Sequence, residues 1–141
     1  MFGDSIYARF NRGDEIISGI LDICRKEKVL SATYSGIGCC SDIVVSSYIP
    51  EKDEFLEHKK SGVLELTSLI GNISADDNDE IFHHTHAMFT YHDKNYNLVT
   101  TGGHLLRATV LYTAEIEIRP VQNGVNSRKQ DEITGITVWK L

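Results

Sequence analysis

The spacing of apolar residues changes once along this chain, and that change constrains the fold more than any other feature. Residues 13–28 place apolar side chains at helical spacing, with acidic residues at the start and basic residues at the end, which is typical of an α-helix. After residue 28 the period becomes two, as expected for β-strands. Segments with strand-like patterns cover residues 6–10, 31–38, 42–49, 54–59, 63–70, 80–91, 96–101 and 110–118.

Strands therefore dominate the expected fold, and polar turns separate them. Residues 120–132 have the composition of a long surface loop, which leads to a last short strand at 136–141. Gly19 lies inside the predicted helix and costs about 1 kcal/mol relative to alanine, which indicates either close packing or tolerance at that position. The length of 141 residues, with 41% hydrophobic and 24% charged residues, predicts a single domain over residues 1–141.

The cysteines and the first residues favour a cytoplasmic protein. The three cysteines are an odd number, and the adjacent Cys39 and Cys40 would pair only through a strained ring, so a secreted disulfide framework is not expected. The first ten residues lack the basic start and apolar block of a secretory signal. No apolar run reaches the length of a membrane span, so we expect no contact with a membrane.

The net charge makes nucleic acid an unfavourable default partner. Fourteen basic residues against 20 acidic residues give a formal charge of −6 with histidine neutral, which repels a phosphate backbone over most orientations. The short basic clusters at 58–60 and 128–129 lack the interleaved aromatic residues of a strand-binding groove. We therefore expect direct DNA binding by this chain to be weak or absent.

Three of the six histidines occur within residues 83–86. In a strand, alternate residues share a face, so His84 and His86 point to the same side while His83 points to the other. Imidazoles two residues apart on one face can reach a single cation at bond lengths of about 2.0–2.1 Å. The spacing is therefore compatible with a metal site, and equally with histidines that only form hydrogen bonds on a half-buried strand.

A third ligand has to come from elsewhere in the fold. His104 is the leading candidate, because Gly102 and Gly103 before it allow a tight turn and a close approach of the backbone. Three neutral imidazoles with a vacant position would form a catalytic type of zinc site. His83 and His92 are expected to be ordinary polar residues.

Several motifs occur together in a specific order. They are SGIG followed by SD (residues 35–38 and 41–42), HTHA (84–87) and GGHL (102–105). In this order and at these separations the chain resembles the plants-and-prokaryotes-conserved (PPC) domain across roughly residues 6–119. The resemblance implies an α+β fold, mainly an antiparallel β-sheet with few flanking helices, that assembles as a homotrimer.

The resemblance also implies a metal site, usually taken to be zinc, formed by His84, His86 and His104. The cofactor expected is therefore zinc or another divalent transition metal. The PPC fold is similar to that of acetolactate decarboxylase, a zinc enzyme with three histidines. That kinship makes a small-molecule reaction chemically conceivable but does not establish one.

The chain departs from the plant members of this family in its partner-binding elements. Plant members carry an AT-hook, an arginine-glycine-arginine-proline element that binds the minor groove, and this chain has none. The plant partner-contact motif corresponds to residues 62–67, which keep the glycine and Glu65 but lose the arginine. DNA binding and plant-type partner contacts therefore cannot be transferred from the family.

Two classes of function are compatible with the sequence. In the first, a trimeric module binds a small ligand or a protein partner, with a link to gene regulation. In the second, a zinc-dependent enzyme, a lyase or hydrolase, uses a general acid or base near the metal. Glu65 is the candidate for that catalytic role, because burial in an apolar strand would raise the pKa of its carboxyl group. A structural role for Glu65, as a partner of Arg107 or in a trimer contact, is the alternative, and we favour the binding module.

Overall fold

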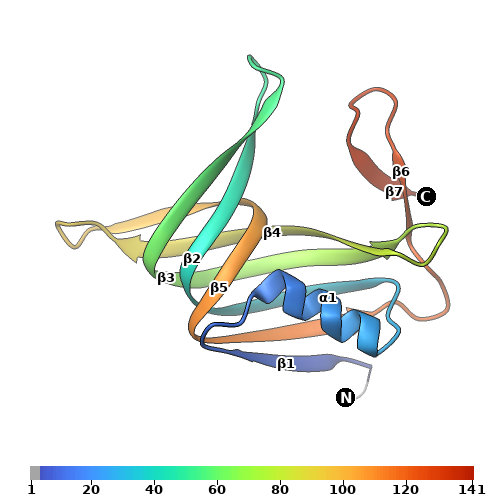
Figure 1. The fold of residues 1–141 in the computed structure, drawn as a ribbon, viewed down its shortest axis with the longest axis horizontal. Coiled ribbons are helices and arrows are strands. Elements are labelled where there is room, and N and C mark those ends of the chain that lie inside the picture. Colours follow the sequence, from blue (N-terminus) through green and yellow to red (C-terminus); the bar gives the residue numbers. More distant parts are fainter. Residues whose placement is uncertain (1–3) are drawn as a thin grey trace.

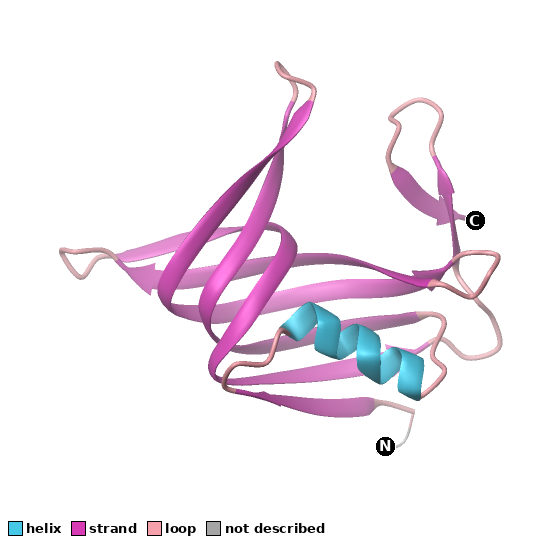
Figure 2. Ribbon diagram, in the orientation of Figure 1, coloured by secondary structure: helices cyan, strands magenta, loops and turns pink. Residues whose placement is uncertain are grey.

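The computed structural model describes residues 4–141, which form mostly β-sheet with one α-helix (Figures 1 and 2). Within these residues the one helix, of 11 residues, is too short to cross a membrane. The elements in chain order are β1 (Ile6–Asn11), α1 (Ile16–Lys26), β2 (Ala32–Ile49), β3 (Glu54–Ala75), β4 (Ile81–His92), β5 (Leu98–Pro120), β6 (Ser127–Gln130) and β7 (Thr137–Lys140).

Each of the four long strands pairs with two of the others, so that β2, β3, β4 and β5 form a closed series of pairs. β2 pairs with β3 and β5, and β4 pairs with the same two strands, all antiparallel. β1 continues the sheet beyond β5, and α1 lies across the sheet in contact with β4 and β5 (Figure 1). The predicted fold, a mainly antiparallel sheet with few helices, is confirmed.

The core of the protein contains mainly aliphatic side chains. The largest fully buried side chains include Phe89, Ile16, Ile20, Ile43, Leu64, Leu66, Leu69 and Leu105.

Three strands are about twice as long as predicted. β2, β3 and β5 contain 18, 22 and 23 residues, and each joins two segments that the sequence pattern separates. In β3 the predicted segments end at residue 59 and resume at residue 63, and the β2–β3 register is irregular at this point. Cys40 and Asp42 are two residues apart in β2, while their partners Leu64 and Ser61 are three residues apart in β3. Because a β-bulge adds one residue to one strand, it moves the apolar alternation to the other face. An uninterrupted strand with a bulge therefore looks like two short strands in the sequence.

Helix α1 is shorter than the predicted range of 13–28. Glu15 precedes it as the N-cap, and its carboxylate accepts hydrogen bonds from the backbone N–H groups of Ile17 and Ser18 at 3.1 and 2.7 Å. The same carboxylate accepts a hydrogen bond from the backbone N–H of Ala108 in β5 at 3.0 Å. Glu15 thus fixes the start of the helix and attaches it to the strand on which it packs.

Gly19 is required by close packing, which resolves the alternatives left by the sequence. A Cβ atom at this position would overlap the aromatic ring of Phe10, which is itself buried in the core. We expect Gly19→Ala to lower the free energy of unfolding by about 1–3 kcal/mol despite the higher helix propensity of alanine. Denaturant unfolding at fixed protein concentration measures this change. In a Phe10→Leu background the same substitution should cost less, and an equal cost in both backgrounds would contradict the explanation.

The C-terminal segment forms a hairpin where the sequence predicts mainly a loop. The predicted loop at 120–132 contains β6, so that part of the prediction is wrong, while the final strand is present as β7. β6 and β7 pair with each other, and one parallel bridge between Ser127 and Ala75 joins the hairpin to β3. β6 has only four residues, and its alternation is too short to distinguish from a polar loop.

Candidate metal centre

Strand β4 presents its histidines as the period of two predicts. His84 and His86 are exposed on one face, whereas Thr85 and Ala87 between and after them are buried on the other. β3 and β5 flank β4, which holds its backbone in an extended form and keeps the two imidazoles on the same side. The alternation of faces is therefore as expected from the sequence.

The third histidine comes from β5. His104 lies directly opposite His86 in the β4–β5 register. The ring centroids of His84 and His86 are 5.2 Å apart, those of His84 and His104 are 5.2 Å apart, and those of His86 and His104 are 5.7 Å apart. The structure thus brings together the three histidines that the sequence singles out.

The donor set fits a transition metal. One ring nitrogen from each of His84, His86 and His104 lies within 4.8 Å of the other two. Nitrogens bound to one tetrahedral ion at about 2.0–2.1 Å are roughly 3.3 Å apart, so small rotations of the imidazoles are sufficient to reach it. An all-imidazole set suits zinc, copper, iron or nickel and disfavours calcium and magnesium, which prefer oxygen ligands.

The electrostatic environment favours the neutral imidazoles that bind metals. Partial desolvation of its ring lowers the pKa of His84, and the nearby His104, His86 and Arg128 lower it further. Burial likewise lowers the pKa of His104, with additional effects of His86 and His83. A neutral imidazole has a free lone pair, so both side chains are prepared for metal binding at neutral pH.

The glycines before His104 act differently from the prediction. Gly102 and Gly103 lie within β5 and form no tight turn. A Cβ atom at Gly102 would overlap the carbonyl oxygen of Ala87, and one at Gly103 would lie 2.9 Å from the carbonyl oxygen of Ser46. Gly103 also has a φ of +148°. The predicted close backbone approach is correct, and its effect is to place His104 where β5 leaves β4 and continues along β2.

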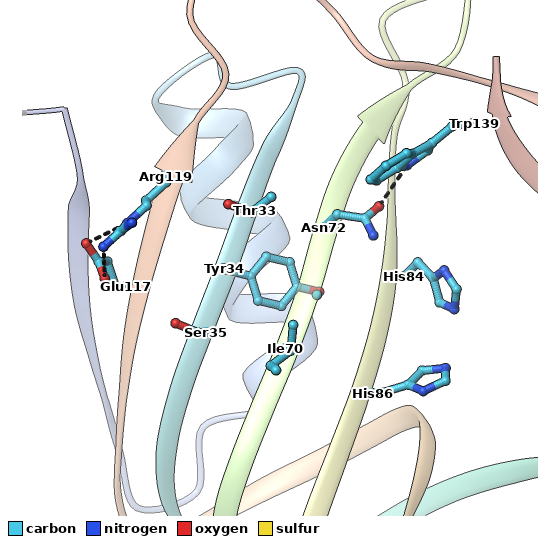
Figure 3. A pocket seen from close by; sticks show the side chains of 11 residues that line it. Thr33, Tyr34, Ser35, Ile70, Asn72, His84, His86, Glu117, Arg119 and Trp139 are labelled. Atoms are coloured by element: carbon cyan, nitrogen blue, oxygen red, sulfur yellow. Dashed lines mark hydrogen bonds and ion pairs between the residues drawn. The ribbon is translucent and has the colours of Figure 1, made fainter. Parts of the chain in front are cut away.

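Two cavities adjoin the histidines. The first, here called the sheet pocket, has a volume of about 700 Å³ and is lined by residues of β2, β3 and β4 together with Glu117, Arg119 and Trp139. Figure 3 shows Tyr34 and Ile70 between the ion pair of Glu117 with Arg119 and the side chains of His84 and His86. The second, here called the hairpin pocket, has a volume of about 530 Å³ and lies between the end of the β2–β3 hairpin and the β6–β7 hairpin. Its lining residues are Ser46, Ser47, Tyr48, Phe55, His83, His84, His86, Gly103, His104, Arg128, Ile136 and Thr137.

The sequence pattern of the Plants and Prokaryotes Conserved (PCC) domain matches residues 2–122, which is most of the chain and includes all three histidines. The chain belongs to this family. The resemblance noted from its motifs is therefore confirmed. No curated protein sequence matches the chain.

Solved structures of similar proteins support the PCC-domain fold. A metal-containing protein from Archaeoglobus fulgidus is 28% identical with a TM-score of 0.85, covering 99% of this chain and 94% of that one. A plant- and prokaryote-conserved protein from Pyrococcus horikoshii is 29% identical with a TM-score of 0.83, covering 99% and 92%. A protein from Bacteroides thetaiotaomicron, described as a candidate DNA-binding protein, is 21% identical with a TM-score of 0.87, covering 99% and 94%.

The predicted kinship of the PCC-domain fold with acetolactate decarboxylase is also found. The α-acetolactate decarboxylase of Bacillus subtilis strain 168 is 12% identical with a TM-score of 0.58. The match covers 86% of this chain and 54% of the enzyme. At this identity the likeness shows a shared fold and nothing about activity.

A hydrogen-bonded chain beside the histidines of this PCC domain was missed by the sequence analysis. Tyr34 in β2 forms a buried hydrogen bond with Thr85, and the Thr85 hydroxyl also bonds Nδ1 of His83 at 2.9 Å. Burial is the main cause that raises the pKa of Tyr34 to about 12 and lowers the pKa of His83. His83 lines the hairpin pocket, so this chain places an imidazole with a lowered pKa near the metal centre. That His83 is an ordinary polar residue stays a prediction.

The C-terminal hairpin adds two more side chains, from beyond the residues that match the PCC family. Arg128 donates hydrogen bonds to the Ser74 hydroxyl and, at 3.0 Å, to the side-chain oxygen of Asn72. The indole N–H of Trp139 donates to the same Asn72 oxygen at 3.3 Å, as Figure 3 shows. The sequence places Arg128 in a basic pair on an expected surface loop, and nothing in it indicates this position.

Glu65 is not brought to the histidines. It is exposed on β3, so the burial expected from its apolar neighbours is wrong. Its register partner on β4, Thr90, is four residues from His86, which corresponds to about 13 Å along the strand. No ion pair joins Glu65 to Arg107 among residues 4–141. The catalytic role of Glu65 remains a sequence-based prediction.

Proposed function

We propose that this PCC-domain protein is a metal-dependent module that binds a small ligand. The observation that supports it is the convergence of His84, His86 and His104 within 4.8 Å beside two cavities. The three imidazoles would hold one zinc ion or another divalent transition metal. Such an ion supplies Lewis acidity and a position for an oxygen or nitrogen donor of the ligand. The related protein from Archaeoglobus fulgidus is described as metal-containing, which supports this assignment.

The metal assignment is tested by elemental analysis of wild-type protein purified without an affinity tag. We expect one transition-metal ion per chain after dialysis against a metal-free buffer, with zinc as the main element. Added zinc should also raise the melting temperature of metal-stripped protein, because binding to the folded state alone stabilises it. Protein that retains no metal and shows no such shift would contradict the proposal.

We assign the functional unit as a homotrimer acting in the cytoplasm. The outward faces of the long strands leave apolar side chains exposed, and exposed apolar area of this kind is typical of a surface that another subunit covers. Three free cysteines, all buried, suit a reducing compartment. Sedimentation equilibrium tests the trimer, and a monomer at micromolar concentration would contradict it. The exposed apolar residues include Ile37, Val63, Ile70, Met88 and Tyr112.

Any link to gene regulation then operates through the bound ligand or a protein partner. Relatives from Bacteroides thetaiotaomicron and Ralstonia eutropha are described as candidate DNA-binding proteins, but they are only 21% and 22% identical. The net charge of −6 opposes contact with a phosphate backbone. We expect no specific DNA binding at physiological salt, and tight, salt-sensitive binding in an electrophoretic mobility assay would contradict this.

A zinc-dependent lyase or hydrolase is the second candidate, and the hydrogen-bonded chain of Tyr34, Thr85 and His83 favours it. His83 holds a neutral imidazole near the metal centre, with Thr85 fixing the orientation of its ring. A group of this kind can take up or release a proton during a reaction. Turnover of small keto acids by the metal-loaded protein, lost in His83→Gln, would favour the enzyme. Ligand-dependent stabilisation without turnover would favour the binding module.

A further inference from the structure

The hairpin pocket has an unbalanced charge. Apart from its histidines, Arg128 is the one charged side chain among the described residues that line it, and no carboxylate is among them. The whole chain has a net charge of −6, so the positive charge of this pocket is opposite in sign to the net charge of the protein. A positive, partly buried group without a counter-ion attracts an anion.

The guanidinium of Arg128 is positioned but not neutralised. Its two hydrogen bonds go to uncharged acceptors, the hydroxyl of Ser74 and the amide oxygen of Asn72. Among residues 4–141 no carboxylate lies within ion-pair distance of it. A guanidinium has five N–H donors, so three remain after these two bonds. Two of the remaining N–H groups belong to Nη1 and one to Nη2, and these two nitrogens lie in one plane and can bind both oxygens of a carboxylate.

Part of the lining of the same pocket is apolar. Tyr48 and Phe55 face each other across the β2–β3 hairpin, with ring centroids 5.4 Å apart, and Ile136 comes from the β6–β7 turn. All three side chains are about half exposed. A ligand with a short hydrocarbon tail would remove this surface from water, which contributes about 25 cal/mol per Å² buried.

We propose that the hairpin pocket binds a small aliphatic carboxylate, with its carboxylate on Arg128 and its tail against Tyr48, Phe55 and Ile136. This assignment rests on the proposed function and deepens it by naming the class of ligand. A carboxylate fits better than a phosphate, because phosphate sites usually add a helix N-terminus or a glycine-rich loop. The described residues that line this pocket come from strands and from the β6–β7 turn.

The test is a nuclear magnetic resonance titration of the full chain with butyrate, which suits millimolar affinities. We expect the arginine side-chain and pocket resonances of wild-type protein to shift on saturation. Arg128→Gln should weaken butyrate binding by at least about tenfold, the loss typical of a charge-assisted hydrogen-bond pair. The neutral isostere butyramide should bind weakly to both proteins. Absence of butyrate binding to wild type, or equal binding to Arg128→Gln, would overturn the proposal.

Two control variants separate recognition from general effects. Arg119→Gln removes a charge of the same type, but one that Glu117 already pairs with at 3.0 Å. Trp139→Phe removes the other hydrogen bond between the hairpin and Asn72 without changing charge. Both variants should bind butyrate like wild type, and Arg128→Lys should fall between wild type and Arg128→Gln. A loss in either control as large as in Arg128→Gln, or tighter binding of inorganic phosphate than of butyrate, would overturn the assignment.

Measuring metal content and butyrate binding separately keeps the two proposals distinguishable. If wild type carries metal but Arg128→Gln binds butyrate equally well, this inference fails and the metal module stands. If wild type carries no metal, the module fails. In that case the same titration of metal-free wild type and Arg128→Gln still decides whether Arg128 binds the carboxylate.

Discussion

His86→Ala is expected to weaken metal binding about 100- to 1,000-fold. His86 belongs to the cluster from both directions, since it shares β4 with His84 and lies opposite His104 in the register. Structural zinc sites with four ligands gain about 10–16 kcal/mol on binding, so an equal share per ligand is about 2.5–4 kcal/mol. That share corresponds to the expected loss in affinity. Competition with a chromogenic zinc chelator measures the dissociation constants of both proteins.

His92→Ala is the matched control for this variant. His92 is exposed at the end of the same strand and is outside the cluster, so its removal should leave zinc affinity unchanged. At one fixed zinc concentration, the zinc-dependent rise in melting temperature should persist in His92→Ala and be much smaller in His86→Ala. Wild-type affinity in His86→Ala would mean that the three imidazoles do not share one ion.

Phe89→Ala is expected to lower the free energy of unfolding by about 3–5 kcal/mol. Among residues 4–141, Phe89 is the largest fully buried side chain, with 0% of its surface exposed. It lies between Leu66 of β3 and Thr101 of β5 in the register. Alanine leaves a cavity where β4 packs in the core. The loss is a large fraction of the 5–15 kcal/mol typical of whole domains. Urea unfolding at one fixed protein concentration measures it.

Phe82→Ala tests whether this cost comes from burial. Phe82 is the same residue type on the same strand, but it belongs to the opposite face and 42% of its surface is exposed. The substitution should change the free energy of unfolding by less than about 1 kcal/mol. Equal costs for Phe82→Ala and Phe89→Ala would show that the two faces of β4 are not distinguished in solution.

The elements were more predictable than their lengths. The 3.6-residue period located α1 and the two-residue period located every long strand, because these periods are local properties of the backbone. The pattern failed where β2, β3 and β5 contain bulges, since one added residue reverses the alternation. It also failed for β6, which has only four residues.

Some residues of the candidate site were predictable from the sequence, and others were not. His84 and His86 share a face because they are two residues apart on a strand, which the sequence alone predicts. Glu65 shows the opposite case. Its apolar neighbours indicate burial, yet its side chain lies on the outward face of the sheet. The positions of His83 and Arg128 depend on residues far away in the sequence. His83 is held by Thr85, which bonds to Tyr34. Arg128 is held by Asn72 and Ser74.

The order of residues along the chain was sufficient to indicate the helix, the strands, the family and the two imidazoles of β4, because each depends on spacing within a short segment. Only the folded chain decided that His104 lies opposite His86, across a β4–β5 register that ends there. It also decided that a C-terminal hairpin brings Arg128 to the same pocket. Contacts between residues far apart in sequence depend on strand register and bulges, which form only when the whole sheet is assembled.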